Sequence, residues 1–376
     1  MALSPDPGPS LSPSVGSGPS LSPSVGPGPV AGTVLLARLD SDGDVLLAGP
    51  AVRAVAAGAR RVVLLAGPRG AAAARLLPGV DQVLSWHCPW IDADPRPVDA
   101  ADIGALVRRL EGAGVDRALV LTSFHQSPLP MALVLRLAGV PWVGAASVDY
   151  PGSLLDLRLQ LPDTGLHEVE RSLALTSAAG FALPAGDDGA LRLLPGLPDT
   201  SGLTGAAPYV VVHPGASVPA RAPSWQWSAD LVRRLVARGH RVVVTGAPAE
   251  RELTAQVSGP HGQDLGGATD LAQLAGVLAR AGAVVVGNTG PAHLAAAVGT
   301  PVVSLFSPVV PAERWRPWGV AHTLLGDQHA ACAGSRARLC PVPGHPCLQD
   351  IATTDAVSAL EALLAEAGPR QLEVSA

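Results

Sequence analysis

Residues 283–294 read AVVVGNTGPAHL, and this stretch is the strongest local evidence for the fold class. A continuous apolar run that ends at Gly287 is typical of a parallel strand buried on both faces. Asn288 or Thr289 suits the N-cap of a following helix, and Pro291 suits its first turn. The spacing therefore predicts a strand, a tight turn and a helix, the repeating unit of an open α/β sheet.

The same unit recurs along the chain, because short Val- and Leu-rich runs alternate with Ala-, Leu- and Arg-rich stretches of helical period. Strands are predicted at residues 33–38, 61–66, 118–122, 141–144, 209–213, 241–245, 283–287 and 301–306. Helices are predicted at residues 48–57, 101–112, 229–238, 249–257, 271–280 and 291–298. This order predicts an α/β fold with doubly wound parallel sheets.

The length of the chain and a Gly- and Pro-rich stretch near its middle indicate two such sheets. A chain of 376 residues exceeds the usual size of one domain. Its units fall into blocks at 31–195 and 205–367, and the Gly-, Pro- and Thr-rich stretch 191–207 is interpreted as a linker. Residues 1–30 hold a Pro-, Ser- and Gly-rich decamer repeat, for which a disordered tail is predicted. We expect two Rossmann-like domains that face a ligand-binding cleft.

Composition excludes several classes of protein. The net charge is −5, all 26 cationic side chains are arginine, and no arginine-rich run occurs, so a nucleic-acid partner is not expected. No apolar run reaches the roughly 18–20 residues of a membrane span. The N-terminus lacks the pattern of a signal peptide, so a soluble, cytoplasmic protein is expected. Membrane contact would then be peripheral at most.

Two predicted strand-to-helix turns are candidate phosphate sites. Gly290 allows close approach of a ligand to the backbone, and the free N–H groups of the following helix favour an anion. His293 falls in the first turn, where it can reach a phosphate oxygen, although an ordinary turn with a surface histidine has the same pattern. The second turn, His213-Pro-Gly215, follows strand 209–212. Downstream of it, Arg221 can clamp a phosphate, although a lone loop arginine is more often solvated.

Three aspartates at alternate positions follow the first predicted strand, in the stretch Arg38-Leu-Asp-Ser-Asp-Gly-Asp44. The spacing suggests a calcium loop, but the sixth and twelfth positions lack the required Gly and Glu. An Asp-x-Asp metal site is a weaker alternative. Asp44 lies at the mouth of the expected cleft, where a carboxylate can accept a proton as general base. Asp40 and Asp42 are interpreted as parts of a solvated turn.

The C-terminal region leaves several alternatives open. Four possible zinc ligands lie close together in the sequence: Cys332, Cys340, His345 and Cys347. The tight Cys-x2-Cys spacing of structural zinc sites is absent, so a disulfide and free thiols are also possible. The Pro- and Trp-rich stretch 304–319 could wall a base or sugar pocket, or could simply pack. Neither a Gly-x-Gly-x-x-Gly motif at the first turn nor a Walker A motif occurs, which disfavours a dehydrogenase and a P-loop ATPase. No cofactor is predicted.

Taken in order, the motifs of residues 33–352 resemble glycosyltransferase family 9, which includes the ADP-heptose:lipopolysaccharide heptosyltransferases. The order of the motifs is as informative as any one of them. The stretches that carry the resemblance are Ser41-Asp-Gly-Asp-Val45, His213-Pro-Gly-Ala216, Gly246-Ala-Pro-Ala-Glu250, Gly287-Asn-Thr-Gly-Pro-Ala-His293, the segment from Ser307 to Trp318, and the segment from Cys340 to Ile351.

The resemblance implies a GT-B fold, with the acceptor on the N-terminal domain and a nucleotide-diphosphate sugar on the C-terminal domain. It implies an inverting, metal-independent single displacement in which Asp44 is the general base on the acceptor hydroxyl. Glu250 corresponds to a carboxylate near the donor ribose. The donor-binding positions that it implies are His213, Gly215, Arg221, Glu250, Asn288, Thr289, Gly290 and His293.

The function expected from the resemblance is transfer of a sugar, with heptose as a candidate, from an ADP-sugar or another nucleotide sugar. The acceptor would be a glycan or a lipid-linked glycan of the cell envelope, such as the lipopolysaccharide core. Two alternatives share the fold: a nucleotide-sugar epimerase, which needs an extra catalytic acid, and a nucleotide-sugar-binding module that has lost catalysis.

Overall fold

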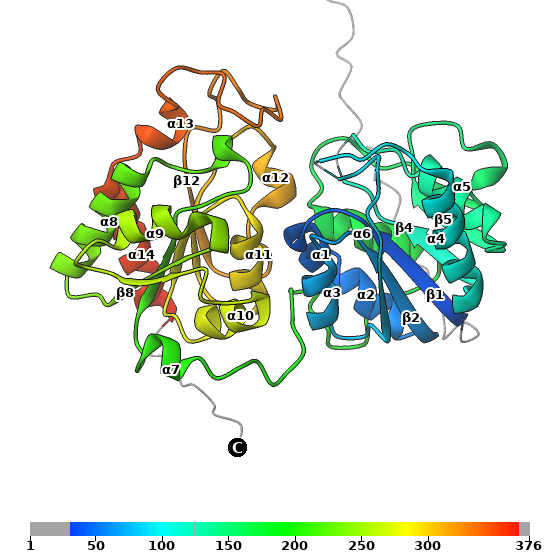
Figure 1. Cartoon of the computed structure of the whole chain (residues 1–376), viewed down its shortest axis with the longest axis horizontal. Helices are drawn as coiled ribbons and strands as arrows, with labels where there is room; N and C mark the ends of the chain where they lie inside the picture. Colours follow the sequence, from blue (N-terminus) through cyan, green and yellow to red (C-terminus); the bar gives the residue numbers. More distant parts are fainter. Residues whose placement is uncertain (1–30, 93, 124, 368–376) are drawn as a thin grey trace, which may run out of the picture.

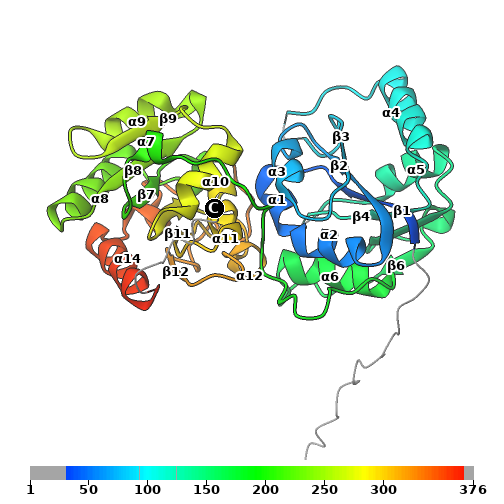
Figure 2. The same cartoon turned by 90° about the horizontal axis from the view of Figure 1, so that it is seen from below.

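The computed structural model describes residues 31–92, 94–123 and 125–367, so the predicted tail at 1–30 lies outside the described residues. The chain forms two six-stranded sheets, each flanked by helices, and the two halves lie side by side (Figures 1 and 2). Neighbouring strands pair in parallel in both sheets, as with β1 and β2 in the first and β10 and β11 in the second. The predicted two-sheet, doubly wound α/β fold is confirmed.

The first sheet has the strand order β3-β2-β1-β4-β5-β6. Its strands are β1 (Ala31–Arg38), β2 (Ala59–Ala66), β3 (Gln82–Ser85), β4 (Arg117–Val120), β5 (Trp142–Ala146) and β6 (Leu157–Leu159). One face packs on the apolar sides of α1 (Asp42–Leu47), α2 (Gly49–Ala56), α3 (Ala71–Leu76) and α6 (Glu168–Ala178). The other face packs on α4 (Ala100–Ala113) and α5 (Leu129–Leu137).

The second sheet has the equivalent order β12-β11-β10-β7-β8-β9. Its strands are β7 (Val210–His213), β8 (Val242–Gly246), β9 (Gln263–Gly266), β10 (Val284–Gly287), β11 (Val302–Leu305) and β12 (His322–Leu325). One face packs on α10 (Leu271–Ala279) and α11 (Gly290–Ala297). The other packs on α8 (Trp225–Ala237), α9 (Arg251–Ser258) and α14 (Thr353–Ala367). The short helices are α7 (Ser201–Thr204), α12 (Ala312–Trp315) and α13 (Pro346–Gln349).

The eight predicted strands correspond to β1, β2, β4, β5, β7, β8, β10 and β11, with ends that differ by one or two residues. The four strands that the prediction missed are β3, β6, β9 and β12, the edges of the two sheets. An inner parallel strand is covered on both faces and is therefore a continuous apolar run. An edge strand is partly exposed, and β9, with the sequence Gln-Asp-Leu-Gly, shows why its pattern is weak.

The two sheets meet through helices that follow their central strands. Helix α1 packs against α11 and α3 packs against α10, so an apolar cluster continues from Leu36 and Leu46 to Leu278 and Leu294 (Figures 1 and 2). The stretch 191–207 runs between the two halves (Figure 1). The proposed domain limits, 31–195 and 205–367, stay a prediction. Because α1 and α11 both start at carboxyl ends of parallel strands, polar groups are placed at this junction.

Helix α1 corrects the prediction of a turn after the first strand. Ser41 stands at its N-cap position with an extended backbone, at φ −86° and ψ 172°. Asp42 and Asp44 occupy the first turn, where negative charge is favoured by the helix dipole. The alternation of aspartates therefore reflects the start of a helix, which holds Asp44 on a defined backbone.

Candidate active site

Asp44 lies in the first turn of α1 and lines a cavity of about 120 Å³ between the two halves. Its Oδ1 accepts a hydrogen bond from Arg38 Nη2 at 3.0 Å, and its Oδ2 accepts one from Ser41 Oγ at 3.0 Å. Burial raises the pKa of Asp44, but Arg38 and Ser41 lower it by more, so the net pKa lies below the ordinary 3.8. The carboxylate is therefore ionised at neutral pH.

Arg38, the last residue of β1, is a buried cation shared by three carboxylates. It is 1% exposed. Its guanidinium pairs with Asp40 at 3.0 Å, with Asp44 at 3.0 Å and with Glu168 of α6 at 3.5 Å. Burial nevertheless raises the pKa of Asp40 to about 6, although Arg38 opposes the shift. Arg38, Asp40 and Asp44 are close together in the sequence, but their ion pairs become evident only in the structure, where Arg38 is buried.

The interpretation of Asp40 and Asp42 as a solvated turn is wrong. Asp40 pairs with Arg38, and Asp42 Oδ1 accepts a hydrogen bond from the backbone N–H of Ala73 at 3.1 Å. Their carboxylates thus have separate partners, and they are not gathered toward a common ion. Among the residues that the structure describes, no three His, Cys, Asp or Glu side chains are placed to hold a metal ion.

The start of α11 forms the opposite wall of the cavity. A Cβ added to Gly43 of α1 would lie 3.2 Å from Gly290 Cα and 3.0 Å from His293 Cδ2. The first turns of the two helices are thus in contact, and glycine permits that approach. Burial lowers the pKa of His293 to about 4, and its buried Nδ1 atom has no hydrogen-bond partner among the residues that the structure describes. A neutral imidazole with spare hydrogen-bonding capacity faces the cavity.

Two arginines from separate loops line the same cavity. Arg221 ends the short 3₁₀ helix η2 (Pro219–Arg221), and within the described part of the chain its buried Nε atom has no hydrogen-bond partner. Arg336 comes from the loop between β12 and α13 and has a left-handed backbone, with φ 59°. Burial lowers the pKa of Arg221, and the charges of Arg336 and Arg338 lower it further, although Asp44 opposes them. Sequence reasoning missed Arg336, because one arginine in an irregular loop carries no pattern.

The remaining predicted residues of the 287–293 turn have different environments. Thr289 stands at the N-cap of α11, where its side chain makes no capping hydrogen bond. Asn288 lines the cavity, but its amide exchanges two hydrogen bonds with the backbone of Ser307, each 3.2 Å long. Asn288 therefore joins the ends of β10 and β11 and shapes the turn.

Three predicted donor residues form a second group beside the cavity. His213 Nδ1 lies 2.9 Å from Thr245 Oγ1, and its Nε2 lies 4.0 Å from Glu250 Oε2. A Cβ added to Gly215 would be only 2.1 Å from Glu250 Oε1. The group stands at the ends of β7 and β8, the next two strands after β10. The predicted residues thus form two neighbouring groups along one sheet edge.

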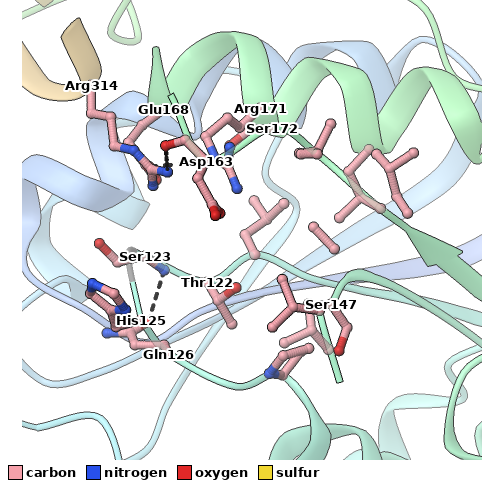
Figure 3. Close-up of a pocket in the computed structure, with 18 of the residues that line it drawn as sticks. Thr122, Ser123, His125, Gln126, Ser147, Asp163, Glu168, Arg171, Ser172 and Arg314 are labelled. Atoms are coloured by element: carbon pink, nitrogen blue, oxygen red, sulfur yellow. Dashed lines mark hydrogen bonds and ion pairs between the residues drawn. The ribbon is translucent and has the colours of Figure 1, made fainter. Parts of the chain in front are cut away.

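A larger cavity of about 380 Å³ opens at the ends of β4, β5 and β6 (Figure 3). Residues 311–314 of the second half close one side of it, and Ser123 lines both this cavity and the smaller one. Figure 3 shows Glu168, Arg171 and Ser172 of α6 above Ser123 and Gln126. Sequence reasoning missed this cavity, since its polar residues come from α6 and from several loops that lie far apart in the sequence.

The Pro- and Trp-rich stretch 304–319 serves mainly as a contact between the halves. Arg314 Nη1 pairs with Glu168 at 3.4 Å, and each side chain is only 2% exposed. Trp318 stacks on His167, with ring centroids 4.5 Å apart. Trp315, by contrast, lines the smaller cavity. The alternative of a packed loop thus describes most of this stretch.

The four cysteines are free thiols. Cys332 packs with Ala220 and Val309, and partly buried Cys340 lies against this cluster. The backbone N–H of Ala220 donates to the carbonyl of Arg338 at 3.0 Å. The cysteine-containing loop is therefore attached to the turn that carries Arg221.

Two doubly wound parallel sheets that face each other across a polar cleft are the architecture of GT-B glycosyltransferases. A family model described as Glycosyltransferase family 9 (heptosyltransferase) matches residues 103–345, well over half of the chain. The chain belongs to glycosyltransferase family 9, and it is a glycosyltransferase of the heptosyltransferase type.

Similar proteins agree with this placement. The chain is 29% identical over 250 residues to lipopolysaccharide heptosyltransferase 2 of Escherichia coli K12, which covers 58% of this chain and 69% of that protein. A family 9 glycosyltransferase from Veillonella parvula has the same fold, with a TM-score of 0.73 and 16% identity over 89% of this chain and 97% of the other. An E. coli heptosyltransferase solved with ADP-2-deoxy-2-fluoro heptose has a TM-score of 0.66 and 21% identity, covering 88% and 99%.

The sequence predicts membrane contact that is peripheral at most. Among the helices at residues 31–367 that the structure describes, none has the length and apolar character needed to cross a membrane.

Proposed function

We propose that this chain transfers a sugar, with heptose as the leading candidate, from a nucleoside-diphosphate donor to a hydroxyl of a glycan or lipid-linked acceptor. The reaction is an inverting single displacement, in which Asp44 is the general base and no metal ion is required. The observation that carries the proposal is the small cavity, where ionised Asp44 faces Arg221, Arg336 and the start of α11.

The donor diphosphate is placed at the start of α11. There the helix dipole and the backbone N–H groups favour an anion, and Thr289, Gly290 and His293 surround it. Arg221 and Arg336 supply the positive charge that stabilises the departing nucleoside diphosphate. The nucleoside then extends along the sheet edge past His213 and Gly215, toward Glu250 as a partner of the ribose. The ADP-heptose analogue bound by the E. coli neighbour favours ADP as the nucleotide.

The acceptor is placed in the larger cavity. Ser123 lines both cavities, so a hydroxyl at this junction can approach Asp44 from the side opposite the diphosphate. Attack from that side inverts the anomeric carbon. Two contacts between the halves, Glu168 with Arg314 and His167 with Trp318, lie beside the junction, and we expect them to limit the access of water and so to favour transfer over hydrolysis. An epimerase needs an extra catalytic acid in the donor site, and among the described residues that line the small cavity Asp44 is the one carboxylic acid.

Nucleotide binding and transfer test this proposal. In a thermal-shift titration with EDTA present, ADP is expected to raise the Tm of the full chain by several degrees, more than UDP, GDP or TDP. ADP-heptose is then expected to release ADP only when an acceptor glycan is added. A larger shift with another nucleotide would show that the donor is not an ADP-sugar. Formation of an epimerised nucleotide sugar in the absence of acceptor would favour the epimerase.

Arg336 is expected to contribute to donor binding and turnover. Arg336→Gln should lower kcat/KM for the donor by about 10–100-fold, because a charge-assisted contact to the diphosphate is lost. Arg338→Gln is the matched control, since Arg338 lies two residues away but does not line the cavity. Steady-state kinetics with varied donor measure both. Equal losses in the two variants would mean that Arg336 acts only through the loop's fold or general charge.

A further inference from the structure

The larger cavity has an acidic mouth. Three carboxylates that line it, Asp149, Asp163 and Glu313, belong to exposed residues, and a fourth, Glu168, is buried in its floor. Two arginines, Arg171 and Arg314, stand against these four acids. Formal charge therefore favours the negative side by two, which repels an anion that approaches the cavity.

The two arginines are already engaged by the protein. Arg314 pairs with Glu168 and also donates to the backbone carbonyl of Asp163, as Figure 3 shows for the first pair. Arg171 Nη1 donates to the carbonyl of Pro162 at 2.6 Å, and its Nε lies 3.9 Å from Glu168. An anionic ligand would have to compete with these carboxylates and carbonyls, so the cavity offers it no preformed cation site.

The rest of the lining suits a sugar ring. Hydroxyl groups of Thr122, Ser123, Ser147, Thr164 and Ser172 surround the cavity, and apolar side chains such as Leu159 and Leu161 form one wall. Carboxylates and hydroxyls accept hydrogen bonds from the hydroxyl groups of a sugar, while the apolar wall covers its C–H face. A phosphate or carboxylate on that sugar meets the negative charges of Asp149, Asp163 and Glu313 at the mouth.

We infer that this cavity binds an uncharged sugar residue as the acceptor, and that it disfavours uronic acids and phosphorylated sugars. The inference rests on the proposed function, which places the acceptor here. Asp163 and Glu313 are its specificity-determining residues, from the first and second halves of the chain respectively.

Matched pairs of probes test the charge preference. The full chain is titrated with the methyl glycosides of glucose, galactose and mannose and with those of the corresponding uronic acids, and binding is followed by saturation-transfer NMR. At low salt at least one hexoside should bind about fivefold or more tightly than its uronide. The difference in affinity between hexoside and uronide should decrease at high salt, because screening weakens the repulsion between the uronide and the carboxylates at the mouth.

Charge variants locate the effect. In the double variant Asp163→Asn, Glu313→Gln, the affinity for the hexoside divided by that for its uronide should fall by at least about threefold. The main cause should be tighter binding of the uronide. Glu111→Gln is the matched control, since exposed Glu111 lies near the end of α4, on the side where β4 begins, away from the cavity. Tighter binding of the uronides by the wild-type chain, or equal ratios in the double variant and the control, would overturn the inference.

Failure of the inference is separable from failure of the proposed function. If ADP binds and ADP-heptose is turned over but uronides are the better acceptors, the transferase proposal stands and the neutral acceptor is wrong. If all six glycosides fail to bind, the cavity is not a sugar site. If neither ADP nor ADP-heptose binds, the donor site itself is wrong.

Discussion

Replacing Asp44 by Asn is expected to lower kcat by about 10²–10⁴-fold, the usual contribution of a positioned general base. The asparagine has nearly the same shape and keeps the first turn of α1, but it cannot take the proton of the acceptor hydroxyl. The dissociation constant for ADP should change by less than about threefold, because the proposed role of Asp44 is on the acceptor hydroxyl and the nucleotide is held by other residues. Steady-state rates of ADP release and calorimetric titration of ADP measure the two effects.

Asp42→Asn is the matched control for this variant. It makes the same chemical change two residues away in the same helical turn, yet Asp42 is not among the residues that line the cavity, and its carboxylate accepts a hydrogen bond from the backbone N–H of Ala73. Its kcat should stay within about threefold of wild type. If both variants lost activity equally, or if Asp44→Asn remained active, the assignment of Asp44 as base would be wrong.

The pH dependence of kcat/KM is a second test of Asp44 as the general base. The pKa of Asp44 is lowered, so the carboxylate stays available as pH falls below neutrality. Protonation of Asp40, whose pKa is about 6, leaves Arg38 more fully to Asp44 and keeps it ionised. A limb of kcat/KM with a midpoint near 7 is therefore not expected from Asp44. Such a limb, present in wild type and shifted by substitution at Asp44, would contradict the lowered pKa.

Replacing Arg38 by Gln is expected to destabilise the fold by about 3–5 kcal/mol, the usual effect of removing one partner from a buried ionic cluster. The change leaves Asp40, Asp44 and Glu168 without their shared cation, in a site where Arg38 is 1% exposed. Urea unfolding monitored by circular dichroism measures the loss. Arg238→Gln is the control, because its pair with Glu361 lies on the surface, with Arg238 61% exposed, and a much smaller change is expected.

The destabilisation of Arg38→Gln should shrink as pH falls from 7 to 5. Without the guanidinium, the buried carboxylates Asp40 and Glu168 take up protons in the folded state before the unfolded chain does. Burial already raises the pKa of both in the wild-type protein. The folded state of the variant then binds more protons than its unfolded state, so acid stabilises it relative to pH 7. A loss that is the same at both pH values would mean that packing, rather than unpaired charge, causes it.

The amino-acid pattern was sufficient for the fold because burial leaves a local trace. A strand covered on both faces must be apolar throughout, so the eight inner strands were recognised, and the turn after β10 placed Gly290 and His293 correctly at a helix start. The position of Asp44 at the cavity could be predicted for a related reason, since residues at the carboxyl end of a central strand face the cleft. The partly exposed edge strands β3, β6, β9 and β12 left no such trace.

The partners of the site residues depend on contacts between distant segments. Arg38 and Glu168 are 130 residues apart in the sequence, and Glu168 and Arg314 are 146 residues apart. No local sequence pattern therefore indicates the buried ionic cluster or the fact that it joins the two halves. Arg336 reaches the small cavity from a loop whose backbone is hydrogen-bonded to Val309 and to Ala220, both far away in the sequence. Periodicity records which side chains are buried, whereas polar partners are chosen by the packing of whole elements. The chain's local patterns thus specified two βα sheets and the turn that begins α11, and their assembly brought the charged groups together.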